Sequence, residues 1–256
     1  MNSIQAIILG ILQGFTEFLP ISSSGHLVVA QHYLGIVQKG VLLEVVLHMG
    51  TLVSIIIYFY NDIKNLLLNV FKGEKDARSY IQYLIIATIP AAISGLILKN
   101  SIETFFSIYV VKWMFVVTAC IVASTYFFNN KKEKKIIWSF ALIIGLSQVF
   151  ALLPGISRSG ITIATAIFLG INHDKAAKFA FYMAIPILFG AAILQYYSLS
   201  AKIEIFTYPL LVGFISSALS GYLVINFLLK IISKGKFHIF SIYLFILSFY
   251  LFLFNI

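Results

Sequence analysis

The chain has 256 residues, of which 61% are hydrophobic and only 11% are charged. A soluble domain carries about a quarter charged residues, so a water-soluble globular protein is excluded and a bilayer is the solvent that fits. The net charge of +9 would indicate nucleic acid in a soluble protein. Here the lysines lie in short segments between apolar runs, where membrane topology explains them better. We therefore expect membrane lipids, and no nucleic acid, as partners.

The chain contains two kinds of apolar region, interrupted and uninterrupted. The first region, 4–36, is interrupted by Pro, Gly and a run of Ser, and a similar region lies at 136–171. A membrane-spanning helix needs about 20 mostly apolar residues. Six uninterrupted stretches meet this requirement: 41–60, 81–98, 110–128, 177–197, 208–229 and 237–254. The pattern predicts an all-α polytopic membrane protein with six transmembrane helices and two re-entrant helical hairpins.

Basic segments orient these spans. Residues 61–80 and 129–135 each hold four Lys or Arg residues, and 230–236 hold three. Lys and Arg are enriched in cytoplasmic loops, so we place all three segments in the cytoplasm. The other side of the membrane then keeps Lys39, Lys99, Lys112 and Lys202.

This orientation makes both interrupted regions re-entrant. The region 136–171 begins and ends on the cytoplasmic side, whereas 4–36 begins and ends outside, so both termini are expected to be extracytoplasmic in the plasma membrane. Each half, 1–128 and 129–256, becomes a hairpin followed by three spans. An odd number of spans gives the two halves opposite orientations within one integrated membrane domain.

An offset of 135 residues independently relates the two halves. It aligns Gln13 with Gln148, and the 27 residues from Gly10 to Ile36 contain ten identities without a gap. Apolar segments can align by chance, but shared Gln, Ser and Gly at fixed spacing favour a true repeat. An inverted repeat with discontinuous helices places a site where the halves meet.

The first hairpin carries a polar motif. Gln13 and Glu17 are four residues apart and share one helical face, and Pro20 ends that helix. The turn that follows, with a new helix near Gly25, exposes backbone N–H groups and hydroxyls that can cradle an anion. Its candidate residues are Ser22, Ser23, Ser24, Gly25 and His26.

The second hairpin differs from the first at one position. Arg158 stands where the offset places Ser23. An arginine inside an apolar region is costly and is by default functional, and its planar fork suits phosphate oxygens. The neighbouring substrate-binding candidates are Gly155, Ser157, Ser159, Gly160 and Thr162.

Each candidate also has a structural alternative. Glu17 and Arg158 could form a structural ion pair, and His26 could hydrogen-bond a helix end. Ser22 and Ser24 are more simply N-caps. Glu44 and His48 lie one turn apart and could join the site or pair with each other. Taken together, a carboxylate, a hydroxyl, an imidazole, an arginine and a phosphate-sized turn indicate phosphoryl transfer.

At these motifs the sequence resembles the undecaprenyl-diphosphate phosphatase family, also known as the bacitracin-resistance proteins. The family motif (E/Q)xxxE matches Gln13 to Glu17, LPxSSxGH matches Leu19 to His26, and PGxSRSxxT matches Pro154 to Thr162. The resemblance implies hydrolysis of a polyprenyl diphosphate to the monophosphate lipid carrier of cell-envelope synthesis. It also implies a divalent cation, Mg²⁺ or Ca²⁺, and a site that opens toward the extracytoplasmic side.

One departure from the family affects the expected roles. Many members carry Glu where this chain has Gln13, so Glu17 is expected to be the main metal ligand or base, with Gln13 assisting. Arg158 would hold the phosphates, and Ser23, His26 or a water would attack. We favour Ser23 as the nucleophile with His26 as the proton carrier.

Two alternatives remain at this point. Inverted repeats with broken helices are typical of transporters, so a polyprenyl-phosphate transporter or flippase could use the same site. A run of small residues could pack helices within one subunit or form a homodimer. These residues are Gly213, Ser216, Ser217, Ser220 and Gly221.

Overall fold

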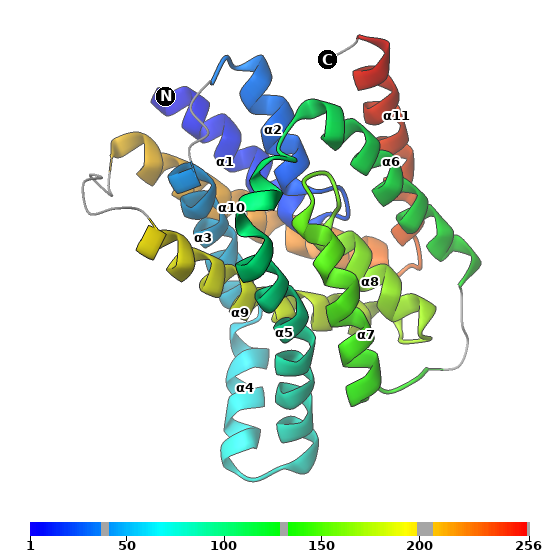
Figure 1. The fold of residues 1–256 in the computed structure, drawn as a ribbon. Helices are drawn as coiled ribbons and strands as arrows, with labels where there is room; N and C mark the ends of the chain where they lie inside the picture. The colour runs from blue at the N-terminus through cyan, green and yellow to red at the C-terminus, as the bar shows by residue number, and fades with distance from the viewer. Residues whose placement is uncertain (37–40, 129–132, 199–206, 255–256) are drawn as a thin grey trace.

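The computed structural model describes residues 1–36, 41–128, 133–198 and 207–254, which contain helices and no strand (Figure 1). In chain order the α-helices are α1 (Ser3–Phe18), α2 (Ser23–Tyr33), α3 (Val41–Tyr58), α4 (Tyr60–Phe71), α5 (Lys75–Glu103), α6 (Ile108–Ser124), α7 (Trp138–Val149), α8 (Arg158–Phe168), α9 (His173–Ser198), α10 (Tyr208–Ile232) and α11 (Phe240–Leu253). Short 3₁₀ turns follow α6 and α7 and precede α11, at Thr125–Phe127, Phe150–Leu152 and Phe237–Ile239. The all-α prediction is confirmed for these residues.

Both interrupted regions form a pair of helices joined by a tight turn. Leu19 is extended because Pro20 follows it, and Ser22 caps α2 by accepting a hydrogen bond from the Gly25 amide. Because Ser22 is the cap, α2 begins at Ser23, earlier than the predicted start near Gly25. The second hairpin repeats these bounds at the 135-residue offset, since α7 begins at Trp138 and α8 at Arg158.

Several helices are long and apolar enough to cross a bilayer. Four of them meet the requirement outright, over 75–98, 108–127, 173–194 and 208–232. The pair α3 and α4 meets it together but bends by 71° between them, and 237–253 forms a shorter apolar segment. The polytopic class is confirmed, whereas the count of six spans with two re-entrant hairpins stays a prediction.

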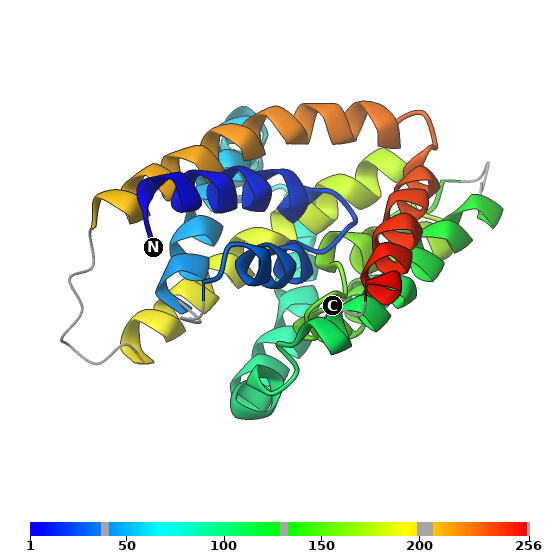
Figure 2. The ribbon, with the colours of Figure 1, turned by 90° about the horizontal axis from the view of Figure 1, so that it is seen from above.

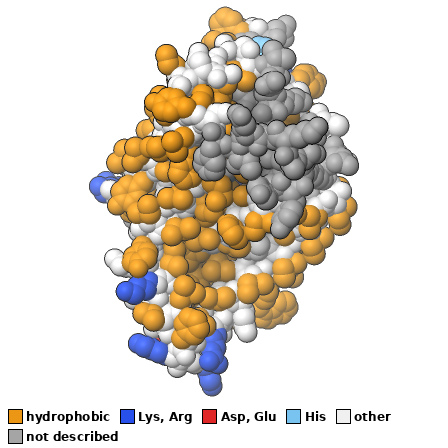
Figure 3. Space-filling view, turned by 90° about the vertical axis from the view of Figure 1, so that its left-hand side faces the viewer, with side chains coloured by type: hydrophobic (Ala, Val, Ile, Leu, Met, Phe, Trp, Pro, Cys, Tyr) orange, Lys and Arg blue, Asp and Glu red, His pale blue; other side chains and the backbone are white. Residues whose placement is uncertain are grey.

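The position of the basic segment 61–80 between two apolar spans led us to expect a loop, but the segment is helical except for residues 72–74. Helix α4 and the start of α5 form an antiparallel pair that projects from one end of the molecule (Figure 1). Ile63 and Leu66 of α4 are one turn apart and pack against the hydrophobic core, which explains why this segment folds. Figure 3 shows Lys and Arg side chains gathered toward this end of an otherwise hydrophobic face.

The two halves interlock through their first hairpin helices. Helix α1 packs along α10, and α7 packs along α5, so each hairpin lies against the other half (Figure 2). Small residues permit the close approach: a Cβ on Gly14 would lie 2.6 Å from the Gly221 nitrogen, and one on Gly145 would lie 2.5 Å from the Ala87 oxygen. The run of small residues on α10 therefore packs within the subunit, and the homodimer stays a prediction.

Apolar side chains fill the interior and also cover the outside. The main core holds fully buried aromatic and aliphatic residues such as Phe18, Phe115 and Ile163. Large hydrophobic residues also lie exposed on the surface, among them Ile97, Leu223 and Phe249. Such a surface is stable against lipid tails and unfavourable in water. The hairpin turns lie inside this apolar envelope, where their polar groups must be satisfied by protein or ligand.

Candidate active site

The turns of the two hairpins are fixed against each other. The Ser159 hydroxyl donates to the Leu19 carbonyl at 2.9 Å. A Cβ on Gly25 would lie 3.0 Å from the Cα of Gly155, so glycine is needed where the turns touch. Thr118 of α6 secures the second turn, because its hydroxyl donates to the Gly155 carbonyl at 2.8 Å. This contact brings the polar residues of both halves together.

The Glu17 carboxylate is the centre of the site. Its Oε2 atom accepts hydrogen bonds from Gln13 Nε2 at 3.0 Å and from Ser23 Oγ at 2.6 Å. His48 Nε2 lies 3.5 Å from the same oxygen, and Arg158 Nη2 donates to Oε1. The Glu17 side chain is only 5% exposed. Four side chains, one from its own helix and three from α2, α3 and α8, therefore surround one buried negative charge.

A small cavity of about 160 Å³ opens beside this carboxylate. Binding sites for whole small molecules typically have volumes of roughly 300–1,000 Å³, so this smaller cavity suits a phosphate group rather than a prenyl chain. Its apolar wall includes Ala91 of α5 and Ile187 and Leu188 of α9. Its polar wall is formed by Glu17, Ser22, Ser23, Ser24, His48, Gln148, Ser157 and Arg158.

His26 lies outside this cavity lining, although the sequence placed it beside the nucleophile. Its Nδ1 lies 2.7 Å from the Ser22 carbonyl, and its Nε2 lies 2.8 Å from the Tyr243 hydroxyl. A carbonyl only accepts, so Nδ1 carries the proton and Nε2 accepts from Tyr243. Ser22 has a φ of 68°, a strained value for a residue with a side chain. The His26 ring therefore holds this strained turn in place.

His48, for which the sequence left two alternatives open, joins the site. Its Nδ1 lies 2.7 Å from the Glu44 backbone carbonyl and donates to it, which leaves Nε2 facing Glu17. The Glu44 carboxylate accepts from Gln31 Nε2 at 3.5 Å. The imidazole that lines the cavity beside Glu17 is thus His48, carried by α3.

The remaining predicted residues divide into cavity-lining and structural groups. Ser22 and Ser157 are matched N-caps, and their hydroxyls lie 3.3 and 3.2 Å from those of Ser24 and Ser159. Thr162 donates to the backbone carbonyl of Arg158 at 2.7 Å. A Cβ on Gly160 would lie 2.9 Å from Cβ of Ser157, so this glycine keeps the cap compact. Ser159, Thr162 and the three glycines of the turns shape the site without lining the cavity.

Gln148 was missed as a site residue. It is 2% exposed and lines the cavity, yet neither its side-chain oxygen nor its nitrogen has a hydrogen-bond partner among the described residues. The sequence did contain a signal, since Gln148 is the repeat counterpart of Gln13. Its neighbour one turn on is Leu152, where the first repeat has Glu17. Without a carboxylate beside it, the Gln148 amide is left for a ligand.

Fold and site together define a polytopic helical membrane protein with a buried carboxylate–arginine pair beside a polar cavity. The family model described as "Bacitracin resistance protein BacA" matches residues 6–250, and the chain belongs to that family. This membership confirms the resemblance that the two hairpin motifs indicated.

Individual relatives cover nearly the whole chain. The undecaprenyl-diphosphatase of Syntrophotalea carbinolica is 38% identical over 259 residues, covering 95% of both chains. The undecaprenyl-diphosphatase of Methanosphaera stadtmanae is 38% identical over 262 residues, covering 95% of this chain and 94% of the relative. That of Thermosipho africanus is 41% identical over 242 residues, covering 93% and 94%.

The structural weight of the Glu17–Arg158 pair can be measured by a double-mutant cycle. Breaking a buried ion pair leaves one uncompensated charge, so Glu17→Gln or Arg158→Gln should each lower the free energy of unfolding by about 3 kcal/mol or more. The double variant should recover part of this loss. The exposed Lys178–Asp62 pair is the control, and Lys178→Gln should cost about 1 kcal/mol at most. Equal losses in the free energy of unfolding at the two pairs would contradict a structural role for the buried Glu17–Arg158 ion pair.

Proposed function

We propose that the protein hydrolyses undecaprenyl diphosphate, or a similar polyprenyl diphosphate, to the monophosphate and inorganic phosphate. Its membership of the BacA family and its near full-length similarity to undecaprenyl-diphosphatases support this reaction. The monophosphate is the lipid carrier for peptidoglycan synthesis, and its recycling accounts for bacitracin resistance. The observation that carries the proposal is the Glu17 carboxylate, which contacts both the Ser23 hydroxyl and the Arg158 guanidinium.

Ser23 is placed to act as the nucleophile. Its hydroxyl donates to Glu17 Oε2 at 2.6 Å, so the carboxylate can accept the proton as Oγ attacks the terminal phosphorus. The new Oγ–P bond forms as the bond from that phosphorus to the bridging oxygen breaks, and the lipid monophosphate leaves with the electron pair. Water then hydrolyses the phosphoserine and releases inorganic phosphate.

His48 is placed to carry the proton onward, a role that the sequence gave to His26. Its Nε2 lies 3.5 Å from the oxygen that receives the Ser23 proton, whereas both nitrogens of His26 are engaged by Ser22 and Tyr243. His26 is accordingly a positioning residue for the Ser22 turn. Its tilted contact with Phe115, with ring centroids 5.1 Å apart, further restricts the ring.

Arg158 and Gln148 bind the phosphates. The guanidinium lines the cavity and can turn from Glu17 toward phosphate oxygens, for which its planar fork is suited. The unpartnered Gln148 amide can donate to a phosphate oxygen in the same cavity. The prenyl chain, too large for this cavity, would leave past the apolar wall formed by α5 and α9.

A divalent cation fits the oxygen ligands at this site. The Gln13 Oε1 atom is buried without a partner among the described residues, one turn from the Glu17 carboxylate. The part of the chain that the structure describes holds no cluster of three or more His, Cys, Asp or Glu for a metal. Mg²⁺ needs few protein ligands when substrate phosphates and water complete its shell. Glu17 and Gln13 would hold Mg²⁺ or Ca²⁺, which would neutralise charge on the phosphates.

The proposed orientation places the site toward the extracytoplasmic side of the plasma membrane. The asymmetry of the basic segments supports this orientation, with both termini outside and the two halves inverted. Figure 1 shows the start of α1 and the end of α11 at the end opposite the basic turn between α4 and α5. A flippase reading is not favoured, because the relatives are diphosphatases and Glu17 with Ser23 offers chemistry that transport does not need.

The reaction is tested with purified protein in detergent and a polyprenyl diphosphate. The unaltered protein should release inorganic phosphate in the presence of Mg²⁺ or Ca²⁺, and Ser23→Ala should lose at least about 100-fold in kcat, since it removes the nucleophile. Ser147→Ala, on α7 outside the cavity, is the control and should keep full activity. No phosphate release with any divalent cation would overturn the proposed function, and a fully active Ser23→Ala would leave water as the nucleophile.

The two histidines are separated by their pH dependence. His48→Asn removes the imidazole proposed to carry the proton, so the pH profile of kcat should change shape. Tyr243→Phe perturbs only the far side of His26 and should scale kcat by about the same factor at every pH. If Tyr243→Phe changed the shape of the pH profile and His48→Asn only scaled kcat, His26 would be the proton carrier instead.

The contribution of Gln148 is tested by Gln148→Leu, which keeps the size and removes the amide. A hydrogen bond to a charged phosphate contributes about 1.5–3 kcal/mol, so KM should rise about 10- to 100-fold with a smaller change in kcat. Gln82→Leu, at an exposed position of α5, provides the matched control. An unchanged KM in Gln148→Leu would show that the amide does not bind substrate.

A further inference from the structure

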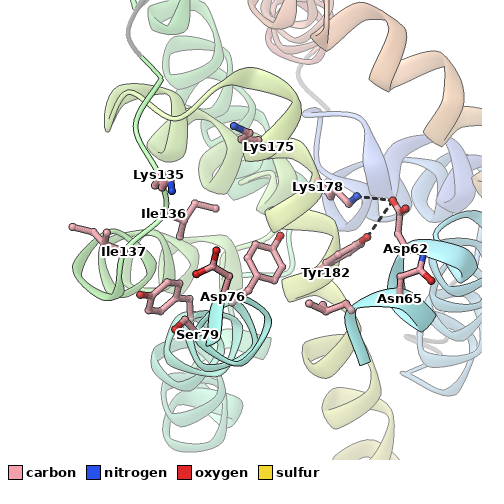
Figure 4. A pocket seen from close by; sticks show the side chains of 13 residues that line it. Asp62, Asn65, Asp76, Ser79, Lys135, Ile136, Ile137, Lys175, Lys178 and Tyr182 are labelled. Atoms are coloured by element: carbon pink, nitrogen blue, oxygen red, sulfur yellow. Dashed lines mark hydrogen bonds and ion pairs between the residues drawn. The ribbon is translucent and has the colours of Figure 1, made fainter. Parts of the chain in front are cut away.

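A second and larger cavity lies away from the catalytic residues. It has a volume of about 610 Å³ and lies between α4, α5, α9 and the segment that leads into α7 (Figure 4). None of the catalytic residues lines it. Binding sites for small molecules typically have volumes of roughly 300–1,000 Å³. This cavity is thus large enough for a ligand of its own, whatever reaction the other site performs.

The charged lining of this cavity favours an anion. Three lysines, Lys135, Lys175 and Lys178, oppose two aspartates, Asp62 and Asp76. Asp62 is already compensated, because its Oδ2 accepts from Lys178 Nζ at 2.6 Å and from the Tyr182 hydroxyl at 3.5 Å. In Figure 4 the three lysines lie along the upper edge of the cavity as drawn, and Asp76 lies below them.

Lys135 and Lys175 are the cations most available to a ligand. Lys135 forms no ion pair with any residue that the structure describes. Lys175 pairs with Glu133 at 2.9 Å, but both side chains are more than half exposed, and such a pair contributes little and exchanges readily. Neutral donors line the same cavity, namely Asn65, Ser79, Tyr80 and Tyr83. Lysine ammonium and tyrosine hydroxyl groups together suit phosphate oxygens.

The cavity has the features of a bilayer–water interface. Ile137 on its rim is 43% exposed and the adjacent Trp138 is 61% exposed, next to the charged Lys135. Trp and Tyr beside Lys are typical of the level where headgroups meet hydrocarbon. A lipid could place its phosphate headgroup among the lysines and its acyl chain along the exposed Ile137.

We propose that this cavity binds the headgroup of an anionic phospholipid. Lys135 and Lys175 provide charge for the phosphate, and the tyrosine hydroxyls provide neutral hydrogen bonds. Basic pockets between membrane helices on the cytoplasmic side bind such headgroups, and residues of the basic segment 61–80 line this pocket together with Lys135. Asp76 opposes the ligand and limits its affinity.

Native mass spectrometry of the full-length protein in detergent tests this site. With phosphatidylglycerol and phosphatidylcholine at equal concentration, the unaltered protein should retain phosphatidylglycerol selectively. Lys135→Gln/Lys175→Gln should weaken that retention by at least about fivefold per lysine, and Asp76→Asn should strengthen it. The matched control, Lys64→Gln/Lys72→Gln, removes the same charge from α4 and the residue after it, outside the cavity, and should retain phosphatidylglycerol normally.

Other results would overturn the proposal. Equal losses in the control and cavity variants would show diffuse attraction to a basic surface. Complete displacement of phosphatidylglycerol by millimolar inorganic phosphate or glycerol phosphate would identify a soluble phosphate ligand instead. If Lys135→Gln/Lys175→Gln does not fold, Lys135→Arg and Asp76→Asn remain informative, because the first should retain the lipid and the second should bind it more tightly. Phosphate release from the diphosphate substrate reports separately on the catalytic site.

Discussion

The structure depends on one buried negative charge. Glu17 lies in a hairpin inside an apolar envelope, where an uncompensated carboxylate would be strongly destabilising. It is compensated by Gln13 on its own helix, Ser23 on the next helix, His48 on α3 and Arg158 from the other half of the chain. The same contacts that stabilise the charge place a hydroxyl, an imidazole and a guanidinium around one cavity. The contacts that compensate the Glu17 charge are therefore also the contacts that assemble the site.

The interlocked halves explain how the hairpins reach each other. Each hairpin packs its first helix on a long span of the opposite half, through glycines where backbones touch. The turns then meet with their backbone groups satisfied, as in the hydrogen bond from Ser159 to Leu19. The repeat gives both halves the same hairpin scaffold. The two hairpins differ at Glu17 and Arg158, so each half contributes a different chemical group to the site. Neither hairpin alone would hold both Ser23, the proposed nucleophile, and Arg158, the proposed phosphate ligand.

Much of this arrangement could be predicted from the sequence, because its signals are local or repeated. Proline after Leu19 and the Ser22 cap fix the hairpin bounds, and the offset that relates Gln13 to Gln148 anticipates matching helix starts. Motif spacing also brought Glu17, Ser23 and Arg158 into one site. These features need little knowledge of tertiary packing.

The misplaced features depend on contacts between distant segments. His26 was expected at the nucleophile, but Tyr243, 217 residues away, turns its ring toward α11. His48 enters because α3 carries it to the cavity and its hydrogen bond to the Glu44 carbonyl leaves Nε2 facing Glu17. The basic 61–80 segment folds as helices because Ile63 and Leu66 find a core. The spacing of residues within one segment does not predict contacts between segments that are far apart in the sequence.

In the proposed site, Glu17 brings a nucleophile and a phosphate-binding group from opposite halves of the chain to one phosphorus. A crystal structure of the protein with orthovanadate, a mimic of phosphate in transfer, tests this arrangement. We expect vanadium bonded to Ser23 Oγ, with Arg158 and Gln148 on its oxygens and His48 beside Glu17. Vanadate bound to His26, or held away from the meeting point of the two turns, would contradict it.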